Sequence, residues 1–338
     1  MKWLITGGCG FIGTNLIRHL IAEGGHQIRV VDNLAVGGRE DLRKVCEINE
    51  VDRCQFLTER KKSDSNSEVR WEGVQLIVGD ITDELLSQNL PAGADIVVHL
   101  AANTGVGPSV TDPRTDCIVN VIGTFNYLEG ARRNEVKRFV FASSGAPLGE
   151  QNPPLHEEMA PHPVSPYGAS KLSGEGYCSA YCRTYGLETV VLRFSNVYGP
   201  GSTHKNSVVA KFIKQAIDRQ PLEVYGDGSQ TRDFIFIDDL VSAILLSAKK
   251  EGIGGELFQI ATNVETSINQ LRLLLLNTLE SIGIREVSVS HGGIRQGDVR
   301  RNFSDSSKAR RVLEWEPKTE LSRGLMVTSK FFKSAMQR

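Results

Sequence analysis

The feature that most constrains the fold is a glycine-rich turn near the start of the chain. A short apolar run at residues 3–6 leads into Thr6-Gly7-Gly8-Cys9-Gly10-Phe11-Ile12-Gly13, and a helical pattern begins at once. The first glycine (Gly7) permits a tight turn, and the second (Gly10) lets the backbone approach a pyrophosphate. The third (Gly13) lets the helix pack closely on the strand, with its N-terminus facing the anion. Strand, turn and helix together predict a dinucleotide site.

The nature of the dinucleotide is indicated by an acidic residue at the end of the next apolar run. Asp32 follows the turn by about 20 residues, the distance expected for a ribose-binding acid. A carboxylate there accepts hydrogen bonds from the ribose hydroxyls and repels a 2′-phosphate, so it favours NAD over NADP. A plain strand-end turn former is the alternative role for Asp32.

Two later strand ends fit the same cofactor. Asp80, between Gly79 and Ile81, has a carboxylate that can meet the adenine amine. The segment Leu100-Ala101-Ala102 ends the following apolar run with small residues, which let a dinucleotide lie against the sheet edge.

The first half of the chain alternates short apolar runs with longer amphipathic segments, which predicts a doubly wound parallel (Rossmann) sheet in an α/β protein. The runs do not alternate polar and apolar residues, as expected for strands covered on both faces. We expect strands at 3–6, 28–32, 74–78, 96–100, 138–143 and 189–195, and helices at 11–23, 116–134 and 167–185. A polar stretch near 34–72 interrupts this pattern and predicts an exposed loop, with a phosphate-binding arm as the alternative.

The sequence predicts two domains. Residues 1–195 are expected to form the NAD-binding domain. Residues 196–338 are expected to form mainly a smaller mixed α/β substrate domain, with some elements returning to the first. Its expected helices are 208–219, 237–247 and 268–282, and its expected strands include 256–260 and 286–289. The length of 338 residues suits two domains at about 150 residues each.

Composition excludes several classes of protein. Lys plus Arg total 39 and Asp plus Glu total 40, so the net charge of −1 gives no general attraction to nucleic acid or to an anionic membrane. No apolar run approaches the roughly 20 residues of a membrane helix. The chain enters a strand within two residues of Met1, so we expect no signal peptide and a cytoplasmic location. None of the six cysteines forms a Cys-x-x-Cys pair, and we expect no metal.

A second motif predicts acid–base chemistry. The fifth expected strand ends in Ser143-Ser144, and Tyr167-Gly-Ala-Ser-Lys171 begins a helix further on. Tyr167 and Lys171 are four residues apart and share a helix face. A nearby ammonium and an oxidised nicotinamide would favour the phenolate, so Tyr167 is the candidate general base, with Ser144 sharing the substrate proton. An amphipathic helix with an incidental Tyr and Lys is the alternative.

Together these motifs resemble the extended short-chain dehydrogenase/reductase family, in particular its nucleotide-sugar epimerases and dehydratases. Four further segments carry the resemblance: Asn120-Val121-x-Gly123-Thr124, Arg193 to Pro200, Gly228 to Phe234, and Arg295-x-Gly297-Asp298. The resemblance implies cofactor contacts from Gly7, Gly10, Phe11, Ile12, Gly13, Asp32, Asn33, Asp80, Ile81, Leu100, Ala101, Ala102, Asn120, Tyr167 and Lys171. It implies substrate contacts from Ser144, Asn196, Val209, Arg232, Arg295, Asp298 and Asn302. Guanidinium groups such as those of Arg232 and Arg295 suit a diphosphate.

The resemblance also bears on the reaction. In the family, the tyrosine takes the O4 proton of a nucleotide sugar while the C4 hydride moves to NAD. The 4,6-dehydratases typically carry an Asp-Glu pair directly after the strand-end hydroxyl, and here those positions are Gly145 and Ala146, which cannot move a proton. The sequence therefore favours a UDP-sugar 4-epimerase that holds NAD tightly and does not consume it. A UDP-glucuronate 4-epimerase, a sugar dehydratase and, remotely, a non-catalytic NAD-binding sensor remain alternatives.

Two expectations concern the substrate and the assembly. Hexose-restricted members commonly place a bulky Tyr at the position of Asn302, so this residue predicts room for an N-acetyl group. His204 and Lys205 could meet a C6 carboxylate or could be an exposed loop pair. The family implies a homodimer formed by the helices at 116–134 and 167–185. Tyr177, Cys178, Tyr181 and Cys182 could contribute to that surface or to core packing.

Overall fold

The computed structural model describes residues 1–62, 70–293 and 299–336. The chain divides into two compact units. The first holds residues 1–147, 163–193 and 244–257, and the second holds 148–162, 194–243 and 258–338. The division differs from the boundary expected after residue 195, with some elements returning to the first domain, because residues 148–162 group with the second unit.

The first unit is built on a parallel sheet in the order β12-β7-β6-β5-β1-β2-β4-β3, except that only Leu257 of β12 belongs to this unit. The register of β1 with β2 and β5, of β2 with β4, of β3 with β4, and of β5 with β6 is parallel in each case. The strands are β1 (Lys2–Thr6), β2 (Gln27–Asp32), β3 (Asn49–Glu50), β4 (Val74–Val78), β5 (Ile96–His99), β6 (Arg138–Ser144), β7 (Glu188–Phe194) and β12 (Leu257–Ile260). This confirms the expected doubly wound α/β fold.

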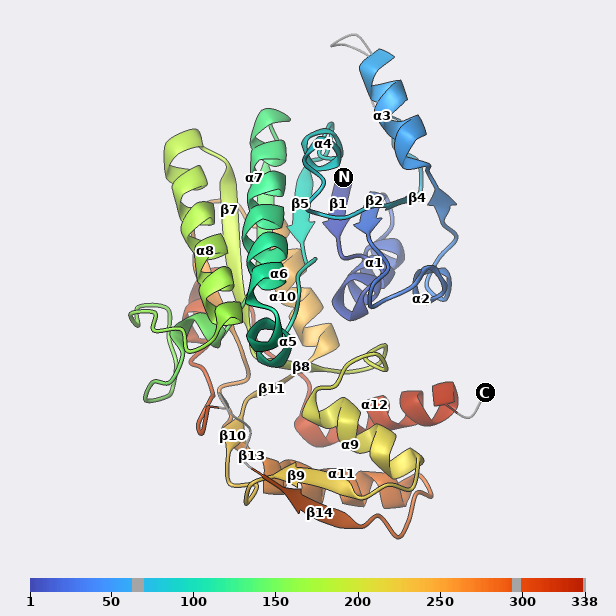
Figure 1. Ribbon diagram of the computed structural model, residues 1–338, viewed down its shortest axis with the longest axis vertical. Coiled ribbons are helices and arrows are strands. Elements are labelled where there is room, and N and C mark those ends of the chain that lie inside the picture. The colour runs from blue at the N-terminus through green and yellow to red at the C-terminus, as the bar shows by residue number, and fades with distance from the viewer. Residues whose placement is uncertain (63–69, 294–298, 337–338) are drawn as a thin grey trace. The chain divides into compact units, whose positions relative to one another are not determined.

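Helices cover both faces of this sheet. The helices are α1 (Phe11–Glu23), α2 (Arg39–Arg43), α3 (Arg53–Lys62), α4 (Glu84–Asn89), α5 (Val106–Thr111), α6 (Pro113–Cys117), a π-helical segment (Ile118–Ile122), α7 (Gly123–Arg133), α8 (Pro166–Tyr185) and α10 (Ile237–Lys249). Figure 1 shows α4, α7 and α8 side by side over one face. On the other side, an ion pair between Lys249 and Glu23 joins the end of α10 to α1.

The order of the strands fixes where a ligand can bind. The chain runs from β1 outward through β2 to β4, and then returns to build β5, β6 and β7 on the other side of β1. Adjacent loops therefore diverge beyond the ends of β1 and β5. In open parallel sheets, ligands bind at this switch point.

The polar stretch near 34–72 is not simply an exposed loop, as the sequence suggested. It contains α2, β3 and α3, and β3 pairs with β4. The buried Arg29 guanidinium lies 3.9 Å from the Trp71 ring centroid and 5.0 Å from that of Phe56, so it fastens the segment to the sheet. The scattered apolar residues of this segment gave no periodic signal, because they pack against core residues that are distant in the sequence.

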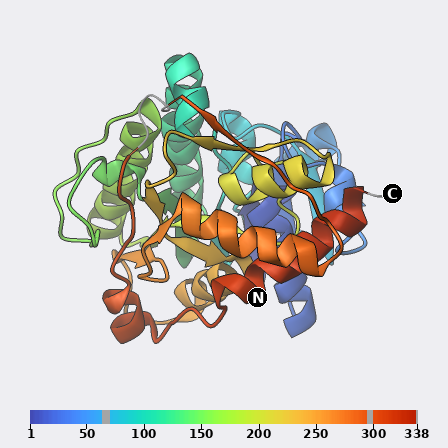
Figure 2. The same cartoon turned by 90° about the horizontal axis from the view of Figure 1, so that it is seen from below.

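The described part of the second unit contains three small sheets, three further α-helices and a π-helical segment (Ala309–Leu313). β8 (Asn196–Tyr198) pairs with β11 (Phe234–Phe236), β9 (Leu222–Tyr225) with β14 (Val289–Gly292), and β10 (Thr231–Arg232) with β13 (Thr266–Ser267). Figure 2 shows α9 (Val208–Ile217), α11 (Ile268–Ser281) and α12 (Leu321–Met336) lying together. The strand expected at 286–289 lies further along the chain, as β14, because its pairing with β9 decides its position.

Two mid-helix glycines give a test of the packing in the first unit. A Cβ at Gly130 in α7 would lie 2.1 Å from the Ser87 carbonyl oxygen, whereas a Cβ at Gly176 in α8 meets nothing within 4 Å. We expect Gly130→Ala to destabilise the protein by about 1–3 kcal/mol, because α7 must move away from α4. Gly176→Ala, its control, should stabilise by up to about 1 kcal/mol through helix propensity. Denaturant unfolding measures both, and equal effects would contradict this packing.

Candidate active site

The glycine turn after β1 is packed too closely for any other residue. Gly7 has a φ of +70°, and a Cβ there would lie 2.8 Å from the Ala101 amide nitrogen at the end of β5. A Cβ at Gly13 would lie 2.5 Å from the Gly7 carbonyl oxygen. The turn, the start of α1 and the end of β5 are thus brought together at the switch point.

The residues around this turn fit a dinucleotide. No side chain caps the N-terminus of α1 at Gly10, which leaves the helix start suited to an anion. Asp32 is 9% exposed and accepts hydrogen bonds from the amides of Cys9 (2.9 Å) and Leu34 (2.8 Å). Burial raises the pKa of Asp32, while these two hydrogen bonds lower it. They also orient the carboxylate, as a ribose-binding acid requires.

A second acidic group lies beside the first. The Asn33 amide donates to Asp80 Oδ2 (2.8 Å), and Asp80 Oδ1 accepts from the amide (2.9 Å) and hydroxyl (2.7 Å) of Thr82. Although burial opposes it, these bonds hold the pKa of Asp80 below its ordinary value. Ile81 is buried next to it. The structure therefore brings together Asp32, Asn33 and Asp80, as expected from the sequence.

His99, which the sequence analysis missed, connects the switch point to α7. Its ring lies 3.0 Å from Thr6 Oγ1 and 3.2 Å from Thr124 Oγ1, and Thr6 Oγ1 also accepts a hydrogen bond from the Ala101 amide (3.1 Å). Complete burial lowers the pKa of His99 to about 3, so the ring is neutral. The sequence signal that could have identified His99 is that it is a polar residue at the end of the otherwise apolar β5.

The structure brings Ser144, Tyr167 and Lys171 together. The hydroxyl of Ser165 caps α8 by accepting from the Gly168 amide (3.1 Å), which places Tyr167 in the first turn. Lys171 is 3% exposed, and its Nζ donates to the Ala142 carbonyl (2.9 Å) and lies 5.9 Å from the Tyr167 ring centroid. Tyr167 is hydrogen-bonded to Ser144, at the end of β6.

Burial acts against the charged forms of this pair. It raises the pKa of Tyr167 to about 12, while the hydrogen bond from Ser144 lowers it and the Asp116 carboxylate raises it. Burial lowers the pKa of Lys171 to about 8, while the carboxylates of Asp116 and Glu175 raise it. An ammonium beside the phenol nonetheless stabilises the phenolate once both groups are charged, and low solvation strengthens that attraction.

Asn120 connects three segments around the Tyr167–Lys171 pair. Its Nδ2 lies within hydrogen-bond distance of the Asn103 carbonyl (2.9 Å), Asp116 Oδ1 (2.9 Å) and Ser170 Oγ (3.2 Å). Its Oδ1 accepts from the Asn103 amide (2.8 Å). The sequence predicted a cofactor contact for Asn120, but these protein partners already occupy both amide hydrogens.

Glu175, a further residue that the sequence analysis missed, lies one turn beyond Lys171. It accepts hydrogen bonds from Ser143 Oγ (2.6 Å) and from two nitrogens of Arg193 (2.8 and 2.7 Å). All three side chains are buried. The four-residue spacing of Tyr167, Lys171 and Glu175 was the signal that could have identified it.

The expected substrate residues lie mainly in the second unit. Arg232 donates to the carbonyls of Thr231 (2.6 Å) and Val299 (2.7 Å), and Asn196 begins β8. Val209 is buried in α9, Asn302 is half-buried, His204 is exposed and Lys205 is half-buried. Arg295 and Asp298 lie outside the described residues.

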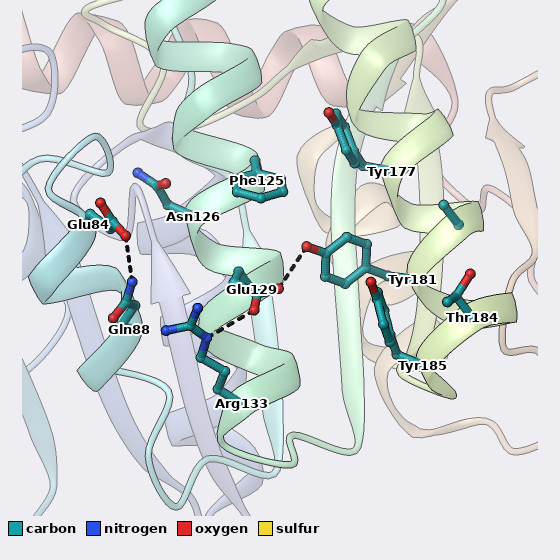
Figure 3. A pocket seen from close by; sticks show the side chains of 11 residues that line it. Glu84, Gln88, Phe125, Asn126, Glu129, Arg133, Tyr177, Tyr181, Thr184 and Tyr185 are labelled. Carbon is teal, nitrogen blue, oxygen red and sulfur yellow. Dashed lines mark hydrogen bonds and ion pairs between the residues drawn. The ribbon is translucent and has the colours of Figure 1, made fainter.

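The outer face of α7 and α8 carries an aromatic hollow of about 440 Å³ (Figure 3). The Tyr181 hydroxyl donates to Glu129 (2.8 Å). Hydrogen bonds to Glu129 lower its pKa to about 2, and the one from Arg132 has the largest effect. Tyr177 is 40% exposed, whereas Cys178 and Tyr181 are buried in the core. Of the residues named for a dimer surface, these two therefore serve packing.

The described residues contain neither a helix suited to spanning a membrane nor a cluster suited to holding a metal. None of their helices is long and apolar enough to span a membrane. Among these same residues, no group of three or more His, Cys, Asp or Glu side chains is arranged to hold a metal ion.

Comparisons with known proteins agree with this geometry. The NAD dependent epimerase/dehydratase family matches residues 3–261. UDP-glucose 4-epimerase of Mycolicibacterium smegmatis is 34% identical, with 100% of each chain covered. A UDP-glucose 4-epimerase structure from Thermotoga maritima, with UDP-glucose, has 34% identity and a TM-score of 0.85, covering 99% and 100% of the two chains. A dTDP-glucose 4,6-dehydratase structure from Streptomyces venezuelae, with NAD bound, has 29% identity and a TM-score of 0.85, covering 100% and 98%.

The Tyr167–Lys171 pair can be tested by two substitutions. We expect Tyr167→Phe to lower kcat at least about 10²-fold, the usual effect of losing a general base, while folding and bound NAD are kept. Lys171→Met should also weaken NAD retention, because the resemblance places its ammonium at the nicotinamide ribose. Tyr177→Phe, which removes an exposed hydroxyl from the same helix, is the control and should leave turnover unchanged. Near-normal turnover of Tyr167→Phe would place the base elsewhere.

Proposed function

Because the chain belongs to the NAD dependent epimerase/dehydratase family, we propose that it is a 4-epimerase of UDP-sugars. The observation that carries the proposal is the Ser144, Tyr167 and Lys171 group, which has Gly145 and Ala146 directly beside it. This group can remove a proton from a hydroxyl, and Gly145 and Ala146 supply no further acid or base.

The chain's own residues provide the cofactor site. Gly7, Gly10 and Gly13 leave room for a pyrophosphate at the start of α1, and Asp32 is oriented to accept from ribose hydroxyls. NAD, when bound, supplies the hydride acceptor and donor. An epimerase returns the hydride within one catalytic cycle, so it gains nothing from exchanging the cofactor.

Tyr167 is the proposed base for the O4 hydroxyl of the sugar. Lys171 stabilises the phenolate electrostatically, and Ser144 orients the reacting hydroxyl through the hydrogen bond that it shares with Tyr167. The 4-keto sugar then rotates in the site, so that the hydride returns to the opposite face of C4. Tyr167 gives the proton back to O4. Because one side chain serves both half-reactions, the enzyme needs no second acid.

Dehydration is less well supported. The family's dehydratases place an Asp-Glu pair where this chain has Gly145 and Ala146. Two buried carboxylates lie near Lys171, but Glu175 is held by Arg193 and Asp116 by Asn120. Neither is arranged to move protons between C5 and C6 of a sugar.

The nucleotide part of the substrate is assigned to the second unit. Arg232 offers a guanidinium, and Val299, which accepts from it, follows the Arg295-x-Gly297-Asp298 motif. This contact joins two motifs that the resemblance links to the diphosphate and the ribose. We also propose that the protein is a homodimer, in which a second copy covers the aromatic hollow of α7 and α8.

The proposed function predicts the state of the purified protein and its products. We expect it to carry NAD and to interconvert C4 epimers of a UDP-hexose without added cofactor, because the hydride is returned in each cycle. Absorbance of the denatured supernatant measures NAD, and NMR identifies the products from UDP-glucose, UDP-N-acetylglucosamine, UDP-glucuronate and dTDP-glucose. A 4-keto-6-deoxy or unsaturated sugar as the main product would support a dehydratase instead. Activity confined to UDP-glucuronate would support the glucuronate 4-epimerase alternative.

Asn302 tests the range of sugars. Half-buried, with backbone neighbours Phe303 and Ser304 held by Leu155, it offers both a donor and an acceptor to an acetamido group. We expect UDP-N-acetylhexosamine to be epimerised at least comparably to UDP-glucose. Asn302→Tyr should reduce N-acetyl activity much more than hexose activity, because the ring would fill the acetamido space. Asn302→Ala keeps the space and separates size from hydrogen bonding. Equal losses on both sugars in Asn302→Tyr would refute this role for Asn302.

A further inference from the structure

A buried carboxylate lies behind the Tyr167–Lys171 pair. Asp116 in α6 is 1% exposed, and its Oδ1 accepts from the Asn120 amide (2.9 Å). The same Asn120 amide lies 3.2 Å from the hydroxyl of Ser170, the residue directly before Lys171. Its Oδ2 is buried and has no hydrogen-bond partner among the described residues. Two elements, α6 and α8, are thus joined at an acidic group that the acid–base pair does not itself require.

Most of the groups that face Lys171 are neutral or are paired with an opposite charge. On its own helix, Glu175 is neutralised by a two-pronged hydrogen bond from Arg193. From β5, His99 is neutral. From β6, the Ala142 carbonyl accepts from Lys171 and adds no net charge. Cys178, one turn beyond Glu175, is a buried thiol whose pKa is raised by burial, so it too is neutral.

Asp116 is therefore the one negative charge near the pair that no arginine balances among the described residues. Its own pKa is raised by burial, against the hydrogen bond from Ser170 and the attraction of Lys171. A carboxylate in a poorly solvated place acts over a longer distance than one in water. It attracts the Lys171 ammonium and repels the Tyr167 phenolate.

We propose that Asp116 is a positioning residue of this site, whose carboxylate, held by Asn120, sets the pH range over which Tyr167 and Lys171 work together. The proposal rests on the proposed base chemistry of Tyr167 for its effect on turnover, but not for its effect on the titration of Tyr167 itself.

The direction of the effect follows from the signs of the charges. The Asp116 carboxylate raises the pKa of both Tyr167 and Lys171. Removing its charge should therefore lower both values. A deprotonated Tyr167 and a protonated Lys171 are both needed, so the acidic and the alkaline limits of activity should move to lower pH together. A change in packing alone would reduce activity at every pH.

The variant that tests this is Asp116→Asn in the NAD-loaded protein. It keeps an acceptor for Asn120 and removes only the charge. Asp112→Asn is the matched control, because Asp112 is the N-cap residue of the same short helix, is exposed, and accepts from the Thr115 amide (3.0 Å), as an asparagine also can. Thermal unfolding checks both variants, and Asp116→Ser is a second neutral replacement if the first unfolds early.

The direct measurement is the ultraviolet titration of tyrosine, in which the curve of a matching Tyr167→Phe variant is subtracted to isolate Tyr167. We expect Asp116→Asn to shift this curve to lower pH by about one unit, the size typical of a nearby charge, and Asp112→Asn to leave it in place. The pH profile of kcat should shift in the same direction. An unshifted curve in folded Asp116→Asn would overturn the proposal. A shifted curve in a protein without epimerase activity would support the role of Asp116 and contradict the proposed function instead.

Discussion

Three consecutive residues at the end of β6 hold three residues of α8 that are one helical turn apart. The Ala142 carbonyl accepts from Lys171, Ser143 donates to Glu175, and Ser144 is hydrogen-bonded to Tyr167. Because three side chains spaced one helical turn apart are all fixed to this strand end, the helix can take only one position along it. The buried pair of Glu175 with Arg193 enforces this position, since breaking one partner of such a pair costs about 3–5 kcal/mol. The placement of Tyr167 and Lys171 is thus a consequence of how α8 packs on β6.

The cofactor side of the first unit depends on a comparable connection. Thr6 ends β1, accepts from the Ala101 amide and contacts His99, whose ring also reaches Thr124 in α7. The close approach of Gly7 to Ala101 is possible only while β1 and β5 keep this alignment. A neutral imidazole can bridge two hydroxyls without bringing a charge into the core, which explains why a histidine is tolerated there.

What the sequence predicted and what it missed follow from the range of the interactions. The glycine turn, Asp32 and the Tyr167–Lys171 spacing are local patterns, set by backbone conformation and helical period, so they could be found without a structure. His99 contacts Thr124, 25 residues away, and Glu175 pairs with Arg193, 18 residues away. Asp116 acts beside Ser170, more than 50 residues away. The helices within 34–72 were missed for the same reason, because Arg29 supplies the contact that holds Trp71. Helical spacing places Glu175 on the same face as Lys171, but no local pattern shows that its partner is Arg193.

Burial determines when the charged forms of Tyr167 and Lys171 are stable. A dry environment raises the pKa of Tyr167 and lowers that of Lys171, so neither charge is favoured on its own. The same environment strengthens the attraction between opposite charges, so the phenolate and the ammonium stabilise each other once both form. A positively charged oxidised nicotinamide would add to that stabilisation, whereas the reduced ring carries no such charge. The phenolate is therefore most populated when the cofactor is ready to accept a hydride. An enzyme that keeps its NAD bound would retain this coupling through every cycle, which favours tight cofactor retention over exchange.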